Sequence, residues 1–463
     1  MRNESAADIP IRLISTRRPS TSNSAHLASS LILGRKDLTL RNLNPFRLWR
    51  AEKYLDSKLL VLLWTVKPLE VVIIPTASAE NKLKQNGARR NPKDDAGMAE
   101  ALSEYDACKS LLFWQEERCS MSPVWSDRGP KTRVEVEVPS APEDGLLVKI
   151  YAAGVCHSDV ILLSAETKRA YFLDKYTLGH EGCGEVVSVG SAVTRFKPGD
   201  MVSVLSVPGC GKSSCPECTR GVPQLCSTGE HYGIGNDGSF ASYIAIRERA
   251  AVRLPPGVSP AAGAVATDAV MTAYQAVVRR GKVKKDDTVL LLGLGGLGFN
   301  ALQIILSIGA RAIVVDQRQE VLDEAVKFGV KEQDVVPVGA GSIAEWVNSN
   351  KVIVDTAIDF VGVSQTFTAA IESVRMAGTV VLVGLLNPGI SFNSQPAVTK
   401  QIDILCSYGG TFSDVEASLD LIAKGVITPQ VETGSMKDFP RILDDLHNGK
   451  IKSRIALVPE GIE

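Results

Sequence analysis

The sequence lacks a long apolar run, a hydrophobic leader and a histidine-rich segment, and each absence excludes a class of protein. No stretch of about 18 uninterrupted apolar residues occurs, so a membrane-spanning helix is not predicted. The best candidate, residues 59–74, is interrupted by Lys67, Pro68 and Glu70. Because no signal peptide opens the chain, a reducing, cytoplasmic location is favoured. Five histidines in 463 residues exclude a His-rich metal site.

The composition is that of a soluble globular protein, but the charge is unevenly distributed. Hydrophobic residues make up 44% of the chain and charged residues 22%, and the length predicts about two to four domains. Residues 1–97 contain 17 of the 51 basic residues and 9 of the 52 acidic residues. The rest of the chain therefore contains 34 basic and 43 acidic residues. The first segment is therefore basic and the remainder acidic.

Residues 1–108 are interpreted as a poorly ordered basic extension. Residues 77–97 are polar and contain glycine and proline, which favours a linker. Three interpretations stay open: a disordered tail, a mitochondrial targeting peptide, or a segment upstream of a true start at Met98. Glu4 and Asp8 weaken the second. Since no aromatic residues alternate with the basic ones, neither nucleic acid nor membrane is predicted as a partner.

From about residue 109 onward, short strands separated by Gly/Pro turns predict a partly open β-barrel. The expected strands span 109–114, 132–139, 146–155, 183–190, 199–207 and 239–246.

After about Ala261 the pattern changes to alternating helices and strands. This alternation predicts an α/β fold with a doubly wound parallel sheet covered on both faces. A helix is expected over 264–281, and the last stretch, from 414 to the end, is expected to hold two helices and a closing strand. The other expected strands span 289–293, 310–316, 334–338, 352–362, 378–385 and 401–410, and the helices 297–309, 320–329 and 367–378.

A glycine-rich turn follows the strand at 289–293. Gly293, Gly295 and Gly298 have G-x-G-x-x-G spacing between a strand and a helix, the context of a dinucleotide site. They permit a tight turn, a close approach of the backbone to a pyrophosphate, and close helix packing. Asp316 ends the next strand, where its carboxylate would bind the adenosine ribose hydroxyls and repel a 2′-phosphate. NAD is thus predicted over NADP, although Arg318 could accommodate that phosphate.

Four cysteines lie within a short loop rich in glycine, proline and serine. Cys210, Cys215, Cys218 and Cys226 have the spacing C-x4-C-x2-C-x7-C. Four thiolates suit a closed, tetrahedral, structural zinc site. Four reduced thiols or two disulfides are the less favoured alternatives.

Two further segments contain metal-binding residue types. The segment GVCHSD contains Cys156 and Ser158, and GHEGCGEVVSVG contains His180 and Glu181. Each is a weak signal alone, since a single cysteine is more often a small buried hydrophobe. A glycine shortly before Cys156 and another directly before His180 would let the two loops converge.

From about residue 109 to 459 the chain resembles the zinc-dependent, medium-chain alcohol dehydrogenase family. The segment Gly179–Glu181, followed by Gly184, Gly190, Val193 and Gly199-Asp200, matches the zinc motif of that family. The resemblance implies a GroES-like catalytic domain (109–269 and 407–463) and a Rossmann dinucleotide-binding domain (270–406). It also implies hydride transfer between an alcohol and NAD, forming an aldehyde or ketone, and a homo-oligomer.

By the same resemblance, Cys156, His180 and Asp268 would bind a catalytic zinc ion, and Glu181 would enter or leave its coordination shell. Three protein ligands leave one position open for a substrate oxygen.

The resemblance assigns roles to three further residues. Ser158 would hydrogen-bond the substrate oxygen, Asp159 would orient the imidazole of His180, and Arg454 would contact the cofactor pyrophosphate.

Two alternatives stay open: a zinc-independent enone or quinone reductase of the same superfamily, and a non-catalytic dinucleotide-binding protein. The presence of Cys156, His180, Asp268 and the four-cysteine loop argues against the first.

Overall fold

The computed structural model describes residues 61–67, 70–75, 138–164, 169, 171–173, 176–387 and 389–459. Its contacts divide the chain into two units, residues 1–104 and 105–463. The strand expected at 109–114 lies outside the described residues, as does most of the one at 132–139. The last two residues of the latter, Val138 and Pro139, are not in a strand.

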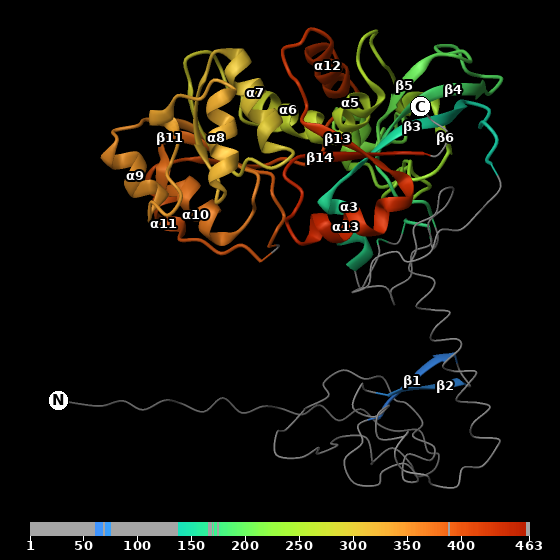
Figure 1. Ribbon diagram of the computed structural model, residues 1–463, viewed down its shortest axis with the longest axis horizontal. Coiled ribbons are helices and arrows are strands. Elements are labelled where there is room, and N and C mark those ends of the chain that lie inside the picture. Colours follow the sequence, from blue (N-terminus) through green and yellow to red (C-terminus); the bar gives the residue numbers. More distant parts are fainter. Residues whose placement is uncertain are drawn as a thin grey trace. The chain divides into compact units, whose positions relative to one another are not determined.

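Within the predicted basic extension, the structure describes one antiparallel hairpin (Figure 1). Strand β1 (Val61–Lys67) pairs with β2 (Glu70–Pro75), with Val61 opposite Pro75 and Lys67 opposite Glu70. Apart from these two strands, the extension lies outside the described residues. Across the described parts of the chain, no helix is long and apolar enough to cross a membrane.

The second unit contains a seven-stranded mixed sheet in the order β13-β14-β3-β4-β5-β7, with β6 paired to β3. Neighbouring strands are antiparallel except β13 and β14, which are parallel. The strands are β3 (Gly145–Val155), β4 (Glu181–Val189), β5 (Met201–Val204), β6 (Tyr243–Arg247), β7 (Ala251–Arg253), β13 (Val431–Ser435) and β14 (Arg454–Val458).

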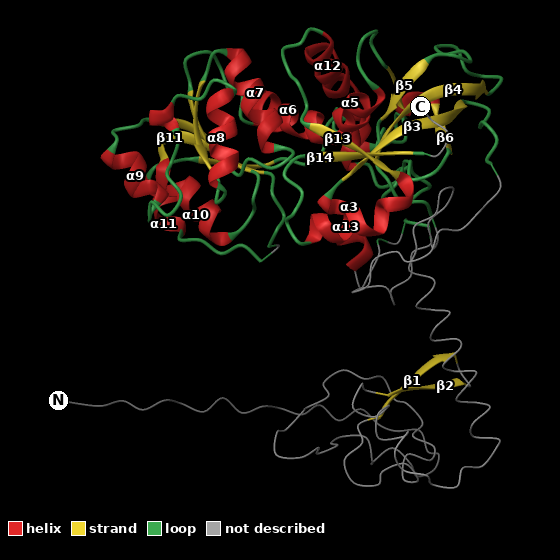
Figure 2. Cartoon of the chain, viewed as in Figure 1, coloured by secondary structure: helices red, strands yellow, loops and turns green. Residues whose placement is uncertain are grey.

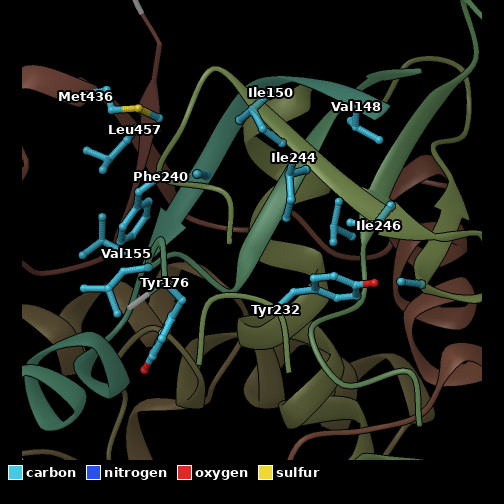
Figure 3. Packing of buried hydrophobic residues seen from close by; sticks show 14 of the residues in the cluster. Val148, Ile150, Val155, Tyr176, Tyr232, Phe240, Ile244, Ile246, Met436 and Leu457 are labelled. Atoms are coloured by element: carbon cyan, nitrogen blue, oxygen red, sulfur yellow. The ribbon is translucent and has the colours of Figure 1, made fainter. Parts of the chain in front are cut away.

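Alternation along the strands of this sheet builds its core (Figure 3). Val148 and Ile150 of β3 and Ile244 and Ile246 of β6 are buried, whereas Lys149 between the first two is half-buried. Successive strand residues point to opposite faces, so these apolar side chains gather on one side. The core positions β3 and β4, whose ends carry Cys156 and His180.

The second sheet is parallel and five-stranded, in the order β12-β11-β10-β8-β9. Val289 and Leu291 of β8 pack into one apolar cluster, and Leu290 and Leu292 into another on the opposite face. A strand that is apolar on both faces is typical of a sheet covered on both sides, as predicted. The strands are β8 (Thr288–Leu292), β9 (Arg311–Val315), β10 (Val354–Asp359), β11 (Val374–Leu382) and β12 (Asp403–Cys406).

The prediction of a strand at 334–338 is wrong. This segment contributes only an isolated bridge between Val335 and Val314. Pro337 has no backbone N–H to donate, which explains why no ladder extends from the bridge.

The helices flank the parallel sheet and the outer faces of the mixed sheet (Figure 2). They are α3 (His157–Ser164), α4 (Pro216–Thr219), α5 (Pro260–Val265), α6 (Met271–Tyr274), α7 (Gly298–Ile308), α8 (Gln319–Lys327), α9 (Ile343–Ser349), α10 (Ser364–Ser373), α11 (Ser394–Thr399), α12 (Phe412–Ala423) and α13 (Phe439–His447).

The helix predicted over 367–378 is wrong in its last five residues, because α10 ends at Ser373 and β11 begins at Val374. The side chain of Lys400 caps the C-terminal end of this helix. Its Nζ donates hydrogen bonds to the backbone carbonyls of Ile371, Glu372 and Val374. A cap supplied from 26 residues downstream gives no local sequence signal.

Candidate active site

Three segments bring four potential metal ligands together. Cys156 follows β3, His180 and Glu181 lie at the start of β4, and Asp268 lies in a π-helical turn, η5 (Ala266–Val270). One ligand atom from each residue lies within 4.8 Å of the others. The Cys156 thiol donates to Asp268 Oδ2 over 3.4 Å, and its Sγ lies 3.6 Å from Ser158 Oγ.

The π-helical turn is the local device that presents Asp268. The sequence predicted a regular helix over 264–281, and the widened turn interrupts it. Such turns within helices often occur at functional sites. The Thr272 hydroxyl, one turn later, donates to Asp268 Oδ1 at 3.0 Å and leaves Oδ2 facing Cys156. Thr272 was not predicted, although its i+4 spacing is a recognisable signal.

Arg454 supplies the positive charge in the described surroundings of this group. Its guanidinium donates to Glu181 Oε1 at 2.8 Å, to Asp268 Oδ2 at 3.1 Å and to the Val155 carbonyl at 3.1 Å. Burial alone would lower the pKa of Arg454, but Cys156, Glu181 and Asp268 outweigh it, and the net pKa is raised.

Arg454 also lies against the glycine turn, because a Cβ on Gly296 would collide with its guanidinium. The resemblance implied a pyrophosphate contact for this arginine. The structure instead gives it contacts with two candidate metal ligands, at a position between them and the turn.

The protonation of the group follows from burial and from Arg454. Burial raises the pKa of Glu181 well above its usual value, against the opposing effect of Arg454. For Cys156 and Asp268, burial acts in the same direction, but the positive charge of Arg454 outweighs it, and both pKa values are lowered. These directions favour the ionised forms of Cys156 and Asp268 and the neutral form of Glu181.

A zinc ion fits this donor set. A thiolate, an imidazole and a carboxylate are the ligand types of catalytic zinc sites. Glu181 Oε2 is buried and has no hydrogen-bond partner, so one acceptor of the group has no proton donor. A divalent cation would compensate the buried negative charge of Cys156 and Asp268 and could accept Glu181 Oε2 as a further ligand.

Asp159 supports both Cys156 and His180. Its Oδ1 lies 3.3 Å from His180 Nδ1, and its Oδ2 accepts a hydrogen bond from the Cys156 N–H at 2.9 Å. Burial opposes protonation of His180, but the Asp159 carboxylate raises the pKa of the imidazole well above its usual value. With Nδ1 turned toward Asp159, His180 Nε2 is left to bind a metal, which would take the place of the second ring proton.

The glycine turn has the geometry of a phosphate-binding loop. Gly293 has φ +88°, a conformation that side chains disfavour, and a Cβ on Gly298 would overlap the Gly293 carbonyl. No atom lies within 4 Å of a Cβ built on Gly295, so the space beside the turn is open. Helix α7 begins at Gly298, so its N-terminus, the positive end of the helix dipole, lies at this turn.

Asp316 lies directly after β9, and its carboxylate is hydrogen-bonded to groups of the protein. Its carboxylate accepts the Leu294 N–H at 2.8 Å and pairs with Arg318 through Nε at 2.9 Å and Nη2 at 3.1 Å. Burial would raise the pKa of Asp316, but the Arg318 hydrogen bond and the Leu294 N–H lower it. The predicted ribose acceptor and the arginine that could accept a 2′-phosphate therefore contact each other.

The four-cysteine loop also gathers its thiols. One sulfur from each of the four cysteines lies within 4.8 Å of the others. Cys215 and Cys226 are 3.7 Å apart and Cys210 and Cys218 3.8 Å apart, so neither pair is a disulfide. Hydrogen bonds from the Thr228 hydroxyl and the Lys212 N–H lower the pKa of Cys210 to about 6, which favours a thiolate.

Two further features were not predicted from the sequence. Gln303 of α7 hydrogen-bonds both backbone groups of Thr428, accepting its N–H at 2.8 Å and donating to its carbonyl at 3.2 Å. A cavity of about 520 Å³ lies near the contact between Gln303 and Thr428, since its lining includes Phe299 and Gln430. It contains none of the metal-binding candidates, and its lining includes Phe299, Glu320, Glu324, Gln430 and Glu432.

Comparison with family models matches two segments of the chain. Residues 142–256 match the Alcohol dehydrogenase GroES-like domain, and residues 296–424 match the Zinc-binding dehydrogenase model. These matches confirm the predicted pairing of a GroES-like domain with a Rossmann-type domain.

Similar proteins agree with those matches. The chain is 31% identical over 335 residues to an alcohol dehydrogenase of Geobacillus stearothermophilus, covering 70% of this chain and 94% of that one. It is 29% identical over 334 residues to alcohol dehydrogenase 2 of Caenorhabditis elegans, with coverage of 71% and 93%.

Solved structures with the same fold include two with bound dinucleotides. One is acetophenone reductase from Geotrichum candidum in complex with NAD, at 32% identity, TM-score 0.62, and coverage of 70% of this chain and 92% of that one. Another is a putative zinc-binding dehydrogenase from Sinorhizobium meliloti bound to NADP, at 27% identity, TM-score 0.63, and coverage of 70% and 94%.

Proposed function

The chain belongs to the medium-chain, zinc-type alcohol dehydrogenase family, and from this membership we propose that it interconverts an alcohol and its aldehyde or ketone with NAD and a catalytic zinc ion. The observation that carries the proposal is the convergence of Cys156, His180 and Asp268, from three distant segments, within 4.8 Å. This donor set beside an open glycine turn supports an alcohol dehydrogenase over a zinc-independent reductase of the same superfamily.

The bound groups and the side chains have separate tasks. Zinc would act as a Lewis acid toward the substrate oxygen and NAD would accept the hydride, chemistry that no side chain provides. Cys156, His180 and Asp268 would hold the ion, and Asp159 fixes the imidazole. Ser158 Oγ, 3.6 Å from Cys156 Sγ, is placed to accept a hydrogen bond from the substrate hydroxyl and so to position its proton for removal.

Three residues tune the charge of the site. Glu181 lies next to the three ligands, and its unpartnered Oε2 would serve as a further, exchangeable donor. Arg454 balances Glu181 and Asp268 and, through its contact with the glycine turn, would also reach the cofactor pyrophosphate. Asp316 supports NAD as the preferred dinucleotide once Arg318 turns away from it.

The four cysteines of the loop at 210–226 would hold a second, structural zinc ion. The open coordination position needed for catalysis is absent where all four donors are thiolates. Their clustering, with Sγ–Sγ distances of 3.7 and 3.8 Å in two of the pairs, supports this assignment over two disulfides.

We further propose a homo-oligomer in the cytoplasm, with the catalytic domain over 109–269 and 407–463 and the dinucleotide-binding domain over 270–406. Strand β12 is an edge of the parallel sheet, and apolar side chains near it are exposed, including Met376, Val398 and Ile404. All seven described cysteines are free, which is usual in a reducing compartment.

Zinc content and NADH absorbance during alcohol oxidation test the function together. We expect two zinc ions per chain and turnover, and we expect Cys156→Ser to lose one zinc and nearly all turnover. Cys406→Ser, which removes an exposed cysteine, is the control and should keep both. Full activity of Cys156→Ser would contradict the zinc mechanism. Cofactor binding without turnover on a broad alcohol panel would favour a non-catalytic protein.

A further inference from the structure

A cluster of aromatic and cationic side chains lies close to the candidate metal group. We call it the Arg169 cluster, and it consists of Arg169, Tyr171, Phe172 and His231. The rings of Tyr171 and Phe172 meet edge to face with centroids 5.0 Å apart, and they lie 5.1 and 5.7 Å from the His231 ring. Tyr171 remains 39% exposed, so this packed cluster presents an aromatic ring to solvent.

The cluster is fixed to the loop that carries His180. A Cβ on Gly233 would lie 2.6 Å from the His180 backbone nitrogen, so the turn after His231 packs directly on that residue. The Leu173 N–H donates to the Gly235 carbonyl at 2.9 Å, which holds the Tyr171 segment on the same turn. Only one turn of backbone therefore separates the cluster from a candidate zinc ligand.

The other neighbour of the cluster, Tyr408, lies just after the dinucleotide-binding domain, beyond the last strand of its sheet. Tyr408 follows the end of β12 at Cys406 by two residues and is 44% exposed. Ligands of open α/β sheets bind outside the carboxyl ends of the strands, which is where Tyr408 lies. The Tyr171 hydrogen bond raises the pKa of Arg169, and the nearby Tyr408 hydroxyl adds to the effect. The contacts of Arg169 with Tyr171 and Phe172 place it beside the turn that packs on the His180 backbone.

The Arg169 guanidinium has N–H donors beyond the one that bonds to Tyr171. Its Nη1 donates to the Tyr171 hydroxyl at 2.7 Å, and its guanidinium lies 5.8 Å above the Phe172 ring. None of the carboxylates in the described part of the chain forms an ion pair with it. Since Tyr171 Oη accepts from Arg169, its own proton is free for a further acceptor, and a planar guanidinium matches a carboxylate.

We propose that Arg169 and Tyr171 bind a carboxylate on the substrate, so that the enzyme prefers aromatic alcohols or carbonyl compounds bearing an acid group remote from the reacting carbon. The exposed rings of Tyr171 and Tyr408 flank the aromatic ring of that substrate. This inference rests on the proposed dehydrogenase function and adds the substrate class.

The test compares two alcohols that differ by one carboxylate: benzyl alcohol and 4-(hydroxymethyl)benzoate. The wild type should have the higher kcat/KM with the acid. Arg169→Gln should lower kcat/KM for the acid about tenfold or more, as for loss of a charge-assisted hydrogen bond, and change the value for benzyl alcohol little. Tyr171→Phe should cause a smaller loss. Arg220→Gln, which removes another exposed arginine, should leave the preference unchanged.

Two binding measurements separate failure of this inference from failure of the function. Terephthalate, a non-reacting diacid, should bind the wild type in calorimetry and bind Arg169→Gln more weakly. NADH fluorescence should report equal NADH affinity for both proteins. Oxidation of benzyl alcohol with the same acid preference in both proteins overturns the substrate class and leaves the function standing. Weaker NADH binding would assign Arg169 to the cofactor phosphates and also overturn it. If neither alcohol reacts but terephthalate binding depends on Arg169, the carboxylate site stands and the dehydrogenase function fails.

Discussion

Arg454 and Glu181 lie 273 positions apart in the sequence, yet the guanidinium donates to the carboxylate at 2.8 Å. Arg454 is 6% exposed and Glu181 fully buried. A buried ion pair contributes little net stability compared with apolar residues, but removal of one partner leaves an uncompensated charge. The stability of this domain is therefore tied to the chemistry of the site.

Replacement of Arg454 tests that link. Arg454→Met should destabilise the protein by about 3–5 kcal/mol, because the Asp268 carboxylate would lose its buried counter-charge and Glu181 Oε1 its hydrogen-bond donor. Urea denaturation of the metal-depleted protein measures the difference. Arg454→Lys keeps the charge but cannot bridge both carboxylates, so it should lose less. An Arg454→Met variant as stable as the wild type would contradict the role assigned to the guanidinium.

The Asp316–Arg318 pair should control cofactor choice. Asp316→Gly removes the carboxylate that repels a 2′-phosphate and frees Arg318 to bind one, so the ratio of kcat/KM for NADP to that for NAD should rise about tenfold or more. Initial rates with both cofactors measure this ratio. The double variant Asp316→Gly/Arg318→Ala is the control and should lose the gain for NADP. Unchanged NAD selectivity in the single variant counts against the ribose role of Asp316.

The Lys400 cap should contribute to stability, although Lys400 belongs to neither of the two candidate metal-binding groups. Lys400→Met removes a donor to the Ile371, Glu372 and Val374 carbonyls and should cost about 1–2 kcal/mol. Thermal denaturation measures the loss. Lys424→Met breaks an exposed i,i+4 pair with Asp420 and should cost less than about 0.5 kcal/mol. Equal effects of the two substitutions would refute the capping role.

The free energy of unfolding should depend on pH in part through the ionisation of Asp200. Its hydrogen bond with the Lys197 ammonium, at 2.6 Å, lowers the pKa of the carboxyl from 3.8 to about 2, with help from Arg253. Because the folded pKa is depressed, the carboxylate stabilises the protein above about pH 4, and this contribution is lost as the pH falls toward 2.

The substitution Asp200→Asn measures the contribution of this ionised carboxylate to stability. At pH 7 the variant should be less stable by roughly 1 kcal/mol, a modest value because Lys197 is exposed. The difference should shrink as the pH is lowered from 4 to 2, which denaturation at several pH values will measure. A difference that is constant over this range would show that the pairing does not depend on ionisation of Asp200.

Much of the site was predictable because its residues lie in motifs with fixed local spacing. The glycine turn, the four cysteines and the segment around His180 each carry their signal within a few residues. The same holds for β8, whose continuous apolar run indicates burial on both faces. Local geometry and sequence pattern agree in all of these places.

The unpredicted features depend on contacts between distant segments. Gln303 meets Thr428 across 125 positions, and Lys400 reaches α10 from another element. The π-helical turn at Asp268 keeps the apolar pattern of a regular helix, so periodicity could not reveal it. Nor does any spacing rule bring Arg169 near Tyr408.

The overlap between a side chain at Gly298 and the Gly293 carbonyl has a consequence for judging relatives of this chain. The third glycine is required by the peptide bond of the first, whether or not a dinucleotide ever binds. A descendant that had given up catalysis would keep this glycine in order to fold. A glycine retained at this position therefore indicates the fold and not the activity. Relatives that are still enzymes are better recognised by residues equivalent to Glu181, Asp268 and Arg454 buried together, because burial of charged groups costs free energy.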